Sequence, residues 1–392
     1  MKFEQTIFAN LWESRDFQFL VSTIMDDPNL IHSNHGFYAE KFRLSGEVVP
    51  TNPKGMAGFV AYMSQLERNG MPHMRAPLGD SIPMERGNEA FYTGSIPDFI
   101  SDAYVEKAPE RWDKKKRFEQ MGDEYQLLKR YAEEWLQPAI DQHEQALSNM
   151  AAQAISTGQV VWNFGAGIYT KLYKADIPAE NFLKAGAVVW SDNANCKILD
   201  QVRKIYNDIR EHLGKEIKLQ LEITRNQWLN NWLKNAQVLE VVRYYHSLNN
   251  QLLPKVIQLD TDTAMNAIKR YNFGDDLPEI VIVEESQYDK ESNQTVHGWN
   301  DNIAVMRPLG KAGEIKRTDI LDQEIYTQYG SSLISRNYTS IKGGLMLLEN
   351  SVHNNGNMKE WQSNLMMSAI PVLDKFLYHY IIDTTQTSST TF

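Results

Sequence analysis

The chain has 392 residues, a formal net charge of −10 and one cysteine; 42% of its residues are hydrophobic and 23% are charged. This length and composition exclude a disordered protein and predict a soluble one with two or three domains. The negative net charge argues against tight, sequence-independent nucleic-acid binding, which needs clustered Lys and Arg. It is compatible with a protein that encloses a nucleic acid without binding it tightly. The lone Cys196 excludes an intramolecular disulfide and fits a reducing compartment. The first residues lack the apolar core of a signal peptide, and no run is long enough to span a membrane.

Glycine and proline interrupt residues 28–112 so often that long regular elements are excluded there. Alternating or apolar runs at 37–44 and 59–66 indicate the two strands of a projecting hairpin. The run at 59–66 could equally form a short helix. An isolated two-stranded ribbon is marginal in water, so such a hairpin usually lies on another surface or another subunit. We therefore expect residues 46–83 to contact mainly neighbouring subunits. A loop-rich small domain is the alternative that the composition leaves open.

Residues 113–157 carry one helical pattern of about 45 residues, which would make a rod of roughly 65 Å. Apolar residues recur at a three-four spacing along one face, and charged residues lie on the opposite face. Gly158 directly follows the pattern and is a suitable C-cap. Pro138 interrupts it, because proline removes a backbone donor and clashes with the preceding turn, so we expect a bend or break near Trp135.

The elements become short and mixed after this helix. The pattern predicts strands at 159–164 and 187–190 and an amphipathic helix at 195–213. The pattern then predicts the order strand, helix, strand twice. The first unit has strands at 218–223 and 238–245 around a helix at 224–235, and the second has strands at 255–260 and 278–285 around a helix at 261–272. This order indicates a mixed α/β domain over roughly 190–320. Further strands are expected in 314–350, the apolar run 361–383 should return to a core, and the last residues should be frayed or form an arm.

A glycine-rich segment resembles a dinucleotide-binding fingerprint. Gly165 and Gly167 follow a predicted strand, and Asp192 could take the place of the ribose-binding acid. The third glycine is missing, and Pro178 falls where the crossover helix should run. A hairpin turn at Gly165 and Gly167 is therefore the favoured interpretation.

Asp260 and Asp262 have the DxD spacing that holds a divalent metal against a nucleotide-sugar diphosphate in some glycosyltransferases. The simpler interpretation is helix capping. Thr261, Asp262 or Thr263 would accept the free backbone N–H groups of a helix that begins at Ala264.

Glu284 and Glu285 end a predicted strand and could suggest a carboxylate pair for acid–base catalysis. Neighbouring strand residues point to opposite faces, so solvated strand-end acids are favoured. The histidines, including His32 and His35, form no metal-binding signature, and Cys196 is favoured as a buried structural cysteine. The sequence therefore predicts no catalytic, cofactor-binding or metal-binding residues.

Several short segments, together with the order of the predicted elements, resemble a known protein family. They are Trp190, Ser191 and Asp192 ahead of a helix, LPEIVIVEE followed by HGWNDNIAVMRPLGKAGEI, and the final NSVHNNGNMKEWQSNLMMSAIPVLDKFLYHYII. With these matches, the order of arm, long helix, α/β domain and returning C-terminal segment resembles the tailed-phage major capsid proteins, specifically the major capsid protein E family.

This resemblance implies an α+β fold of the Hong Kong ninety-seven type. The implied division is an N-terminal arm at 1–35, an extended loop with adjoining strands at 36–112, a peripheral domain with a spine helix at 113–190, an axial domain at 191–313, and a return to the peripheral domain with a C-terminal tail at 314–392.

The implied function is structural rather than enzymatic. Such proteins form pentamers and hexamers of an icosahedral virion capsid that encloses double-stranded DNA without sequence-specific binding. They assemble in the host cytoplasm, with scaffolding, portal and decoration proteins as possible partners, and neither a membrane nor a cofactor is implied. An encapsulin-like nanocompartment shell is the alternative within the same fold. A metal-dependent nucleotide-sugar glycosyltransferase that uses Asp260 and Asp262 is the alternative from another class.

Overall fold

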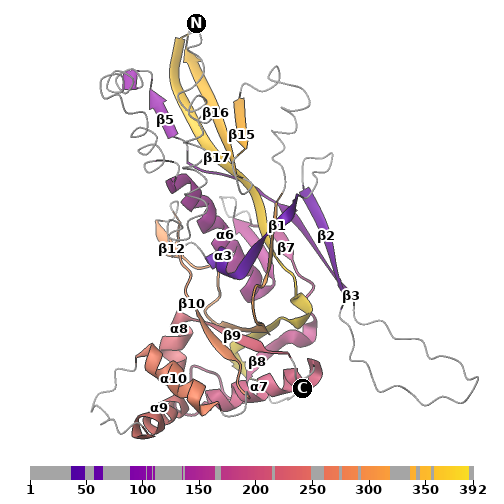
Figure 1. Cartoon of the computed structure of the whole chain (residues 1–392), viewed down its shortest axis with the longest axis vertical. Coiled ribbons are helices and arrows are strands. Elements are labelled where there is room, and N and C mark those ends of the chain that lie inside the picture. Colours follow the sequence, from indigo (N-terminus) through magenta and orange to yellow (C-terminus); the bar gives the residue numbers. More distant parts are fainter. Residues whose placement is uncertain are drawn as a thin grey trace, which may run out of the picture.

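The chain folds into helices and several separate β-sheets, as the α+β expectation requires. The structure, a computed structural model, describes residues 37–48, 57–64, 89–102, 104–107, 109–110, 135, 137–163, 169–213, 217–248, 260–272, 276–289, 293–317, 336–340, 345–354 and 357–387. These residues form two bodies stacked along the long axis in Figure 1, and each body has its own hydrophobic cluster.

The lower body in Figure 1 is built on a five-stranded sheet with the order β10-β9-β13-β18-β8. Its strands are β8 Phe182–Gly186, β9 Leu219–Thr224, β10 Glu279–Val283, β13 Ile303–Pro308 and β18 Tyr380–Thr387. The β9–β10 and β8–β18 pairs are parallel, and the β9–β13 and β13–β18 pairs are antiparallel. All six residues of the interior strand β9 are buried, which fits a strand that is covered on both faces.

Helices cover the outer face of this sheet (Figure 1). They are α7 Ile198–Leu213, α8 Arg225–Gln227 with the π-helical turn Trp228–Trp232, α9 Ala236–Leu248 and α10 Thr261–Tyr271. The inward face of α7 places Ile198, Val202 and Ile209 in the core at the predicted spacing. Trp232 joins the helices, because its ring meets Trp190 edge-on at 5.8 Å and stacks on Trp228 at 6.0 Å between ring centroids.

The upper body contains the long helix α6 Gln137–Thr157, which packs along the strand β17 Asn357–Leu373. Met150, Ala151, Ala154 and Ile155 are fully buried on α6. The helix ends at Gly158, whose φ of +70° closes it in the left-handed conformation expected of a C-cap. Pro138 is the second residue of α6 as the structure describes it, and Trp135 shortly before it has π-helical geometry. The predicted part at 113–134 lies outside the described residues, so the break near Trp135 stays a prediction.

Strand β17 organises the largest sheet, with the order β1-β14-β17-β16-β15. The other strands are β1 Phe42–Val48, β14 Gly313–Arg317, β15 Arg336–Ser340 and β16 Leu345–Asn354, and β4 Asp98–Ile100 and β5 Tyr104–Lys107 pair along β17. Gly313 is required in β14, because a Cβ there would lie 1.9 Å from the carbonyl oxygen of Val372.

A four-stranded sheet completes the upper body. It has the order β2-β3-β7-β6 and consists of β2 Ala57–Ser64, β3 Glu89–Ile96, β6 Gln159–Asn163 and β7 Tyr169–Lys174. The smaller elements are the helix α3 Phe37–Lys41, the 3-10 turns η2 Ala179–Asn181 and η5 Phe376–Tyr378, and the β-hairpin of β11 Gln287–Asp289 with β12 Gln294–Val296.

The five-stranded sheet separates the two hydrophobic clusters. On β13, Ala304 and Met306 belong to the lower cluster and Val305 to the upper one. On β18, Tyr380 and Ile382 face down while Ile381 faces up. This alternation follows from the two-residue period of a strand. The sheet therefore joins the two bodies into one packed unit.

Most of the predicted elements that fall in the described residues are confirmed, and three assignments are wrong. Residues 238–245 are part of the helix α9, because Val238, Val241 and Val242 are buried at a three-four spacing. Residues 187–190 form a turn, and the strand lies before them as β8. In 37–44 only the end is a strand, because residues 37–41 form α3. The predicted strand 255–260 lies outside the described residues except for its last position.

Candidate functional site

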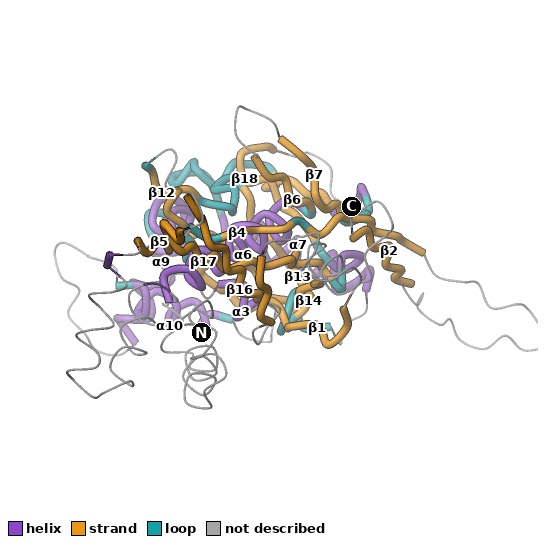
Figure 2. The backbone as a smooth tube through the Cα atoms, turned by 90° about the horizontal axis from the view of Figure 1, so that it is seen from above, coloured by secondary structure: helices purple, strands orange, loops and turns teal. Residues whose placement is uncertain are grey.

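The β2–β3 ribbon projects from the packed bodies. Its strands pair antiparallel through eight residue pairs, from Ala57 with Ile96 to Ser64 with Glu89. Two further pairs, formed by Thr93 and Gly94 of β3 with β7, attach the ribbon to the upper body. Figure 1 and Figure 2 both show the ribbon extending away from α6 and the packed bodies. The predicted hairpin therefore exists, but it pairs 57–64 with 89–96 rather than with 37–44.

A second ribbon extends from the opposite end of the upper body. Strands β16 and β17 pair from Leu345 with Met367 to Asn354 with Asn357, and they rise above α6 in Figure 1. At its base β17 carries Leu365, Ile370 and Val372, which are fully buried. One strand thus begins in a projecting ribbon and ends in the core beside α6.

The DxD residues serve as a helix cap. The carboxylate of Asp260 accepts the backbone N–H of Asp262 at 3.4 Å and the hydroxyl of Thr263 at 3.3 Å, and α10 begins at Thr261. Capping was therefore the right interpretation, but the capping residue is Asp260, and the helix begins three residues earlier than expected. Asp262 is exposed on the first helical turn.

Glu284 and Glu285 directly follow β10 and both line a cavity of about 370 Å³, but their surroundings differ. Glu284 is exposed and pairs with Arg225. Glu285 is not a solvated acid, because its side chain is 2% exposed and accepts the backbone N–H of Trp299 at 2.8 Å and the amide of Gln287 at 2.7 Å. Burial raises the pKa of Glu285, and these hydrogen bonds partly offset that effect.

The glycine-rich segment lies between two strands that form a hairpin. β6 and β7 pair antiparallel, from Asn163 with Tyr169 onward, and no parallel crossover joins them. This topology contradicts a dinucleotide-binding turn, while Gly165 and Gly167 themselves lie outside the described residues. Asp192 accepts the side-chain amide of Asn195 at 2.9 Å in an exposed turn. Burial raises the pKa of the Cys196 thiol to about 11, which fits the structural role expected for it.

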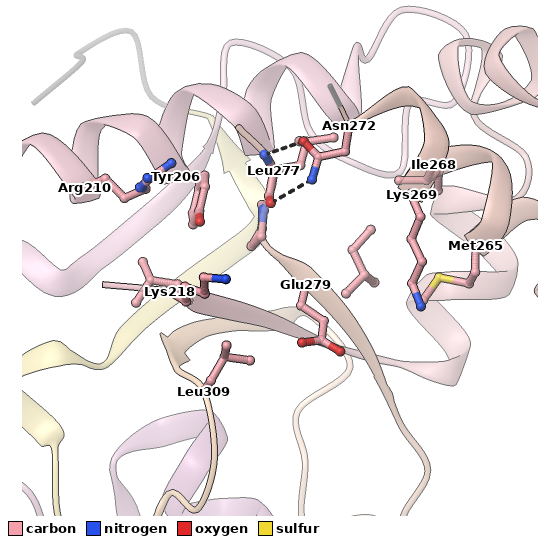
Figure 3. A pocket seen from close by; sticks show the side chains of 13 residues that line it. Tyr206, Arg210, Lys218, Met265, Ile268, Lys269, Asn272, Leu277, Glu279 and Leu309 are labelled. Atoms are coloured by element: carbon pink, nitrogen blue, oxygen red, sulfur yellow. Dashed lines mark hydrogen bonds between the residues drawn. The ribbon is translucent and has the colours of Figure 1, made fainter. Parts of the chain in front are cut away.

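The lower body has an open cavity of about 730 Å³ between α7, α10 and the first residues of β9 and β10. Figure 3 shows Arg210, Lys218, Lys269 and Glu279 around it, and Leu309 at its edge. The described lining has no His, Cys, Ser or Thr and only one carboxylate. Its single carboxylate, Glu279, therefore has no second acid beside it in this lining.

A buried ionic group lies on the upper face of the five-stranded sheet. Both carboxylate oxygens of Glu222 accept hydrogen bonds from Arg307, each at 2.9 Å, and Lys41 donates to Oε1 at 2.7 Å. The side chains of Glu222 and Arg307 are 0% and 2% exposed. Burial alone would raise the pKa of Glu222, but the charges of Arg307 and Lys41 outweigh it and lower that pKa to about 2. The sequence pattern gave no signal for this group, because its members are 85 or more positions apart.

Within the part of the chain that the structure describes, no three His, Cys, Asp or Glu side chains are grouped so that they could hold a metal ion. No helix among the described elements is both long and apolar enough to cross a membrane.

No family model and no curated protein matches the chain. Among solved structures, the Cyanophage A-1(L) capsid asymmetric unit is similar with a TM-score of 0.43 and 11% identity over 92% of this chain and 99% of that one. The capsid of the Cyanophage P-SCSP1u gives a TM-score of 0.40 and 10% identity over 89% and 90% of the two chains. The asymmetric unit of the bacteriophage PhiM1 mature capsid gives a TM-score of 0.39 and 9% identity over 91% of this chain and 88% of that one.

Proposed function

We propose that this chain is the major capsid protein of a tailed phage, which assembles into pentamers and hexamers of an icosahedral head around double-stranded DNA. The observation that carries the proposal is the β2–β3 ribbon, which extends from the packed bodies as two paired strands and has two residue pairs with β7 at its base. A two-stranded ribbon is marginally stable in water, so it needs a neighbouring surface to cover it. In a closed shell that surface is the next subunit.

The division into domains follows as part of this proposal. The ribbon corresponds to the extended loop within 36–112, and α6 is the spine helix of a peripheral domain at 113–190. The lower body is the axial domain at 191–313, and β14 to β17 belong to the return segment at 314–392. Residues 1–35 are the N-terminal arm. In this arrangement β18 lies in the sheet of the axial domain, so the return segment contributes to both bodies.

The partners proposed are further copies of the chain and, in the virion, scaffolding, portal and decoration proteins. The net charge of −10 keeps the inner wall from binding the enclosed DNA tightly. Assembly would take place in the host cytoplasm. An encapsulin-like shell would use the same contacts but enclose protein cargo. Nucleic-acid analysis of purified particles separates the two, because a phage head contains DNA of genome length.

The glycosyltransferase alternative depends on free metal ligands at Asp260 and Asp262. The Asp260 carboxylate is already engaged by two donors of its own helix. Asp262→Asn should therefore leave assembly intact and cost at most about 1 kcal/mol. A tight manganese site that this substitution abolishes would favour the transferase instead.

Removing the ribbon tests the proposal. Ala57 and Ile96 are cross-strand partners, so their Cα atoms are neighbours, and two glycines can replace residues 58–95 without moving the ends. We expect this variant to melt cooperatively like the full chain, because the buried residues of α6, β17 and the lower body are untouched. It should assemble poorly or not at all.

A matched variant keeps β2 and β3 and replaces only residues 65–88 with an Asn-Gly turn. It separates the contribution of the paired strands from that of the segment between them. If the variant without residues 58–95 forms normal shells at the normal rate, the ribbon is not an assembly contact and the capsid proposal loses its main support.

A further inference from the structure

The open cavity of the lower body, called the α7–α10 cavity from here on, has an apolar floor and a cationic rim. Its floor consists of buried apolar residues, which are Leu219, Ile268, Leu277, Pro278 and Ile280. Its rim carries the cations Arg210, Lys218 and Lys269 and one carboxylate, that of Glu279 (Figure 3). Leu309 at the edge is 39% exposed and adds apolar surface. A cavity of this kind fits an apolar side chain that has acidic neighbours.

The charges of the rim are available to a partner. Lys218 and Lys269 are exposed, and neither forms an ion pair with a residue that the structure describes. Arg210 lies over the Tyr206 ring, with 5.1 Å between the guanidinium and the ring centroid. The whole chain has a net charge of −10, so this excess of cations is a local exception on an acidic protein. A second copy of the chain therefore offers the acidic surface that this rim attracts.

Phe182, the first residue of β8, is an exposed apolar side chain that matches this cavity. It is 52% exposed, and two exposed acids, Asp176 and Glu180, precede it in the segment after β7. Strand β8 is one edge of the five-stranded sheet, and β10, which contributes to the cavity, is the other edge. A single exposed apolar residue is common on a protein surface. An aromatic ring that follows two acids at an open sheet edge is, in addition, complementary to an apolar cavity with a cationic rim.

The charge that follows Phe182 fits the same arrangement. Lys184 is exposed and lies two residues further along β8, so it is on the same side of the strand. Its ammonium group is the counterpart of Glu279, the single carboxylate of the rim. Acids before the ring and a cation after it thus correspond to the mixed but mainly positive rim of the cavity.

We propose that Phe182 of one copy docks in the α7–α10 cavity of the next copy, with Glu180 facing the cations of the rim. Because Phe182 and the cavity lie at opposite edges of one sheet, the contact joins different surfaces of the two copies. Such a heterologous contact repeats from copy to copy and closes into a ring when the rotation between copies allows it. This docking rests on the proposed shell function, and it names the surfaces by which the lower bodies of neighbouring subunits meet.

Sedimentation velocity of the full chain over a range of concentrations tests the docking. Phe182→Ser removes the exposed ring, and it should raise the concentration needed for assembly by at least about tenfold. Lys269→Glu alters the opposite side of the contact and should act in the same direction, so it keeps the test valid if Phe182→Ser folds poorly. Tyr244→Ser is the matched control, because Tyr244 on α9 is 61% exposed and does not line the cavity. It should leave assembly unchanged.

Cross-linking between two different variants tests the contact itself. A chain with Glu180→Cys is mixed with a chain that carries Lys218→Cys or Lys269→Cys, and a bis-maleimide is added during assembly. The native Cys196 is buried and therefore protected. Covalent dimers that join the two positions should form in at least one mixture and in neither variant alone. Asp262→Cys is the control for the rim, since Asp262 is exposed at the other end of α10 and should give no such dimer.

Two results would overturn the docking and leave the shell proposal standing. One is that Phe182→Ser and Lys269→Glu both assemble like the unaltered chain. The other is that the Asp262→Cys chain cross-links as well as the rim variants, or that each variant links mainly to itself. Stable monomers of the unaltered chain at every concentration would instead contradict the docking and the shell together.

Discussion

Glu222 should be among the side chains whose loss is most costly to the lower body. Glu222→Gln keeps the shape of the side chain but removes the carboxylate that pairs with both Arg307 and Lys41 in this buried site. Two buried cations would then lack a counter-charge, and breaking a buried ion pair in this way costs about 3–5 kcal/mol. The exposed pair of Glu284 and Arg225 gives a matched control, because Glu284→Gln should cost no more than about 1 kcal/mol.

Urea unfolding followed by tryptophan fluorescence measures both variants, since Trp190, Trp228 and Trp232 are buried in the lower body. The difference between Glu222→Gln and the unaltered protein should also depend on pH. The folded-state pKa of Glu222 is lowered to about 2, so its contribution is present above about pH 4.5 and is lost as the pH falls toward 2. A cost below about 1 kcal/mol at pH 7 would show that Lys41 and Arg307 find other compensation, and would refute the reasoning.

Three further predictions concern single residues. Gly313→Ala should destabilise the chain by several kcal/mol, because the added Cβ would collide with the Val372 carbonyl. At Gly310 an added Cβ meets no atom within 4 Å, so Gly310→Ala should cost only about 1 kcal/mol, which comes from the positive φ. Thermal unfolding of the two variants measures this difference. Asp260→Ala should cost about 1 kcal/mol by removing the cap of α10, which urea unfolding would detect. Burial lowers the pKa of His379 to about 4, so the unfolded chain binds a proton at a higher pH than the folded one. The free energy of unfolding should therefore fall by up to roughly 3 kcal/mol as the pH drops from 6.5 to 4. In unfolding experiments at several pH values, His379→Gln should make this dependence weaker.

The sequence predicted the amphipathic helix α7 and the strands β9 and β10 correctly, because the local residue pattern of each segment fits only one type of secondary structure. The pattern at 238–245 was ambiguous: its β-branched valines suggest a strand, while the spacing of Val238, Val241 and Val242 fits one helix face. Burial resolves such a case, and burial depends on which elements pack together. The same holds for Glu285, whose position next to an exposed Glu284 gave no sign that Trp299 and Gln287 would enclose it.

Long-range pairing explains the remaining differences. The ribbon was expected from its glycines, prolines and apolar runs, but the partner of 57–64 lies at 89–96, and no local pattern fixes that choice. The ionic group of Lys41, Glu222 and Arg307 joins residues from three separate parts of the chain. The cap of α10 was expected at Thr261, Asp262 or Thr263, but Asp260 is the capping residue, because the sequence offers several neighbouring side chains that can accept the free backbone N–H groups.

Electron microscopy of the purified full chain, at high concentration and with or without a scaffold, tests the central proposal most directly. The account predicts closed shells, or at least rings of five and six subunits, in which the β2–β3 ribbon of each subunit lies on a neighbour. The variant with two glycines in place of residues 58–95 should remain folded and fail to form them. Stable monomers of the full chain under all of these conditions would contradict the proposal.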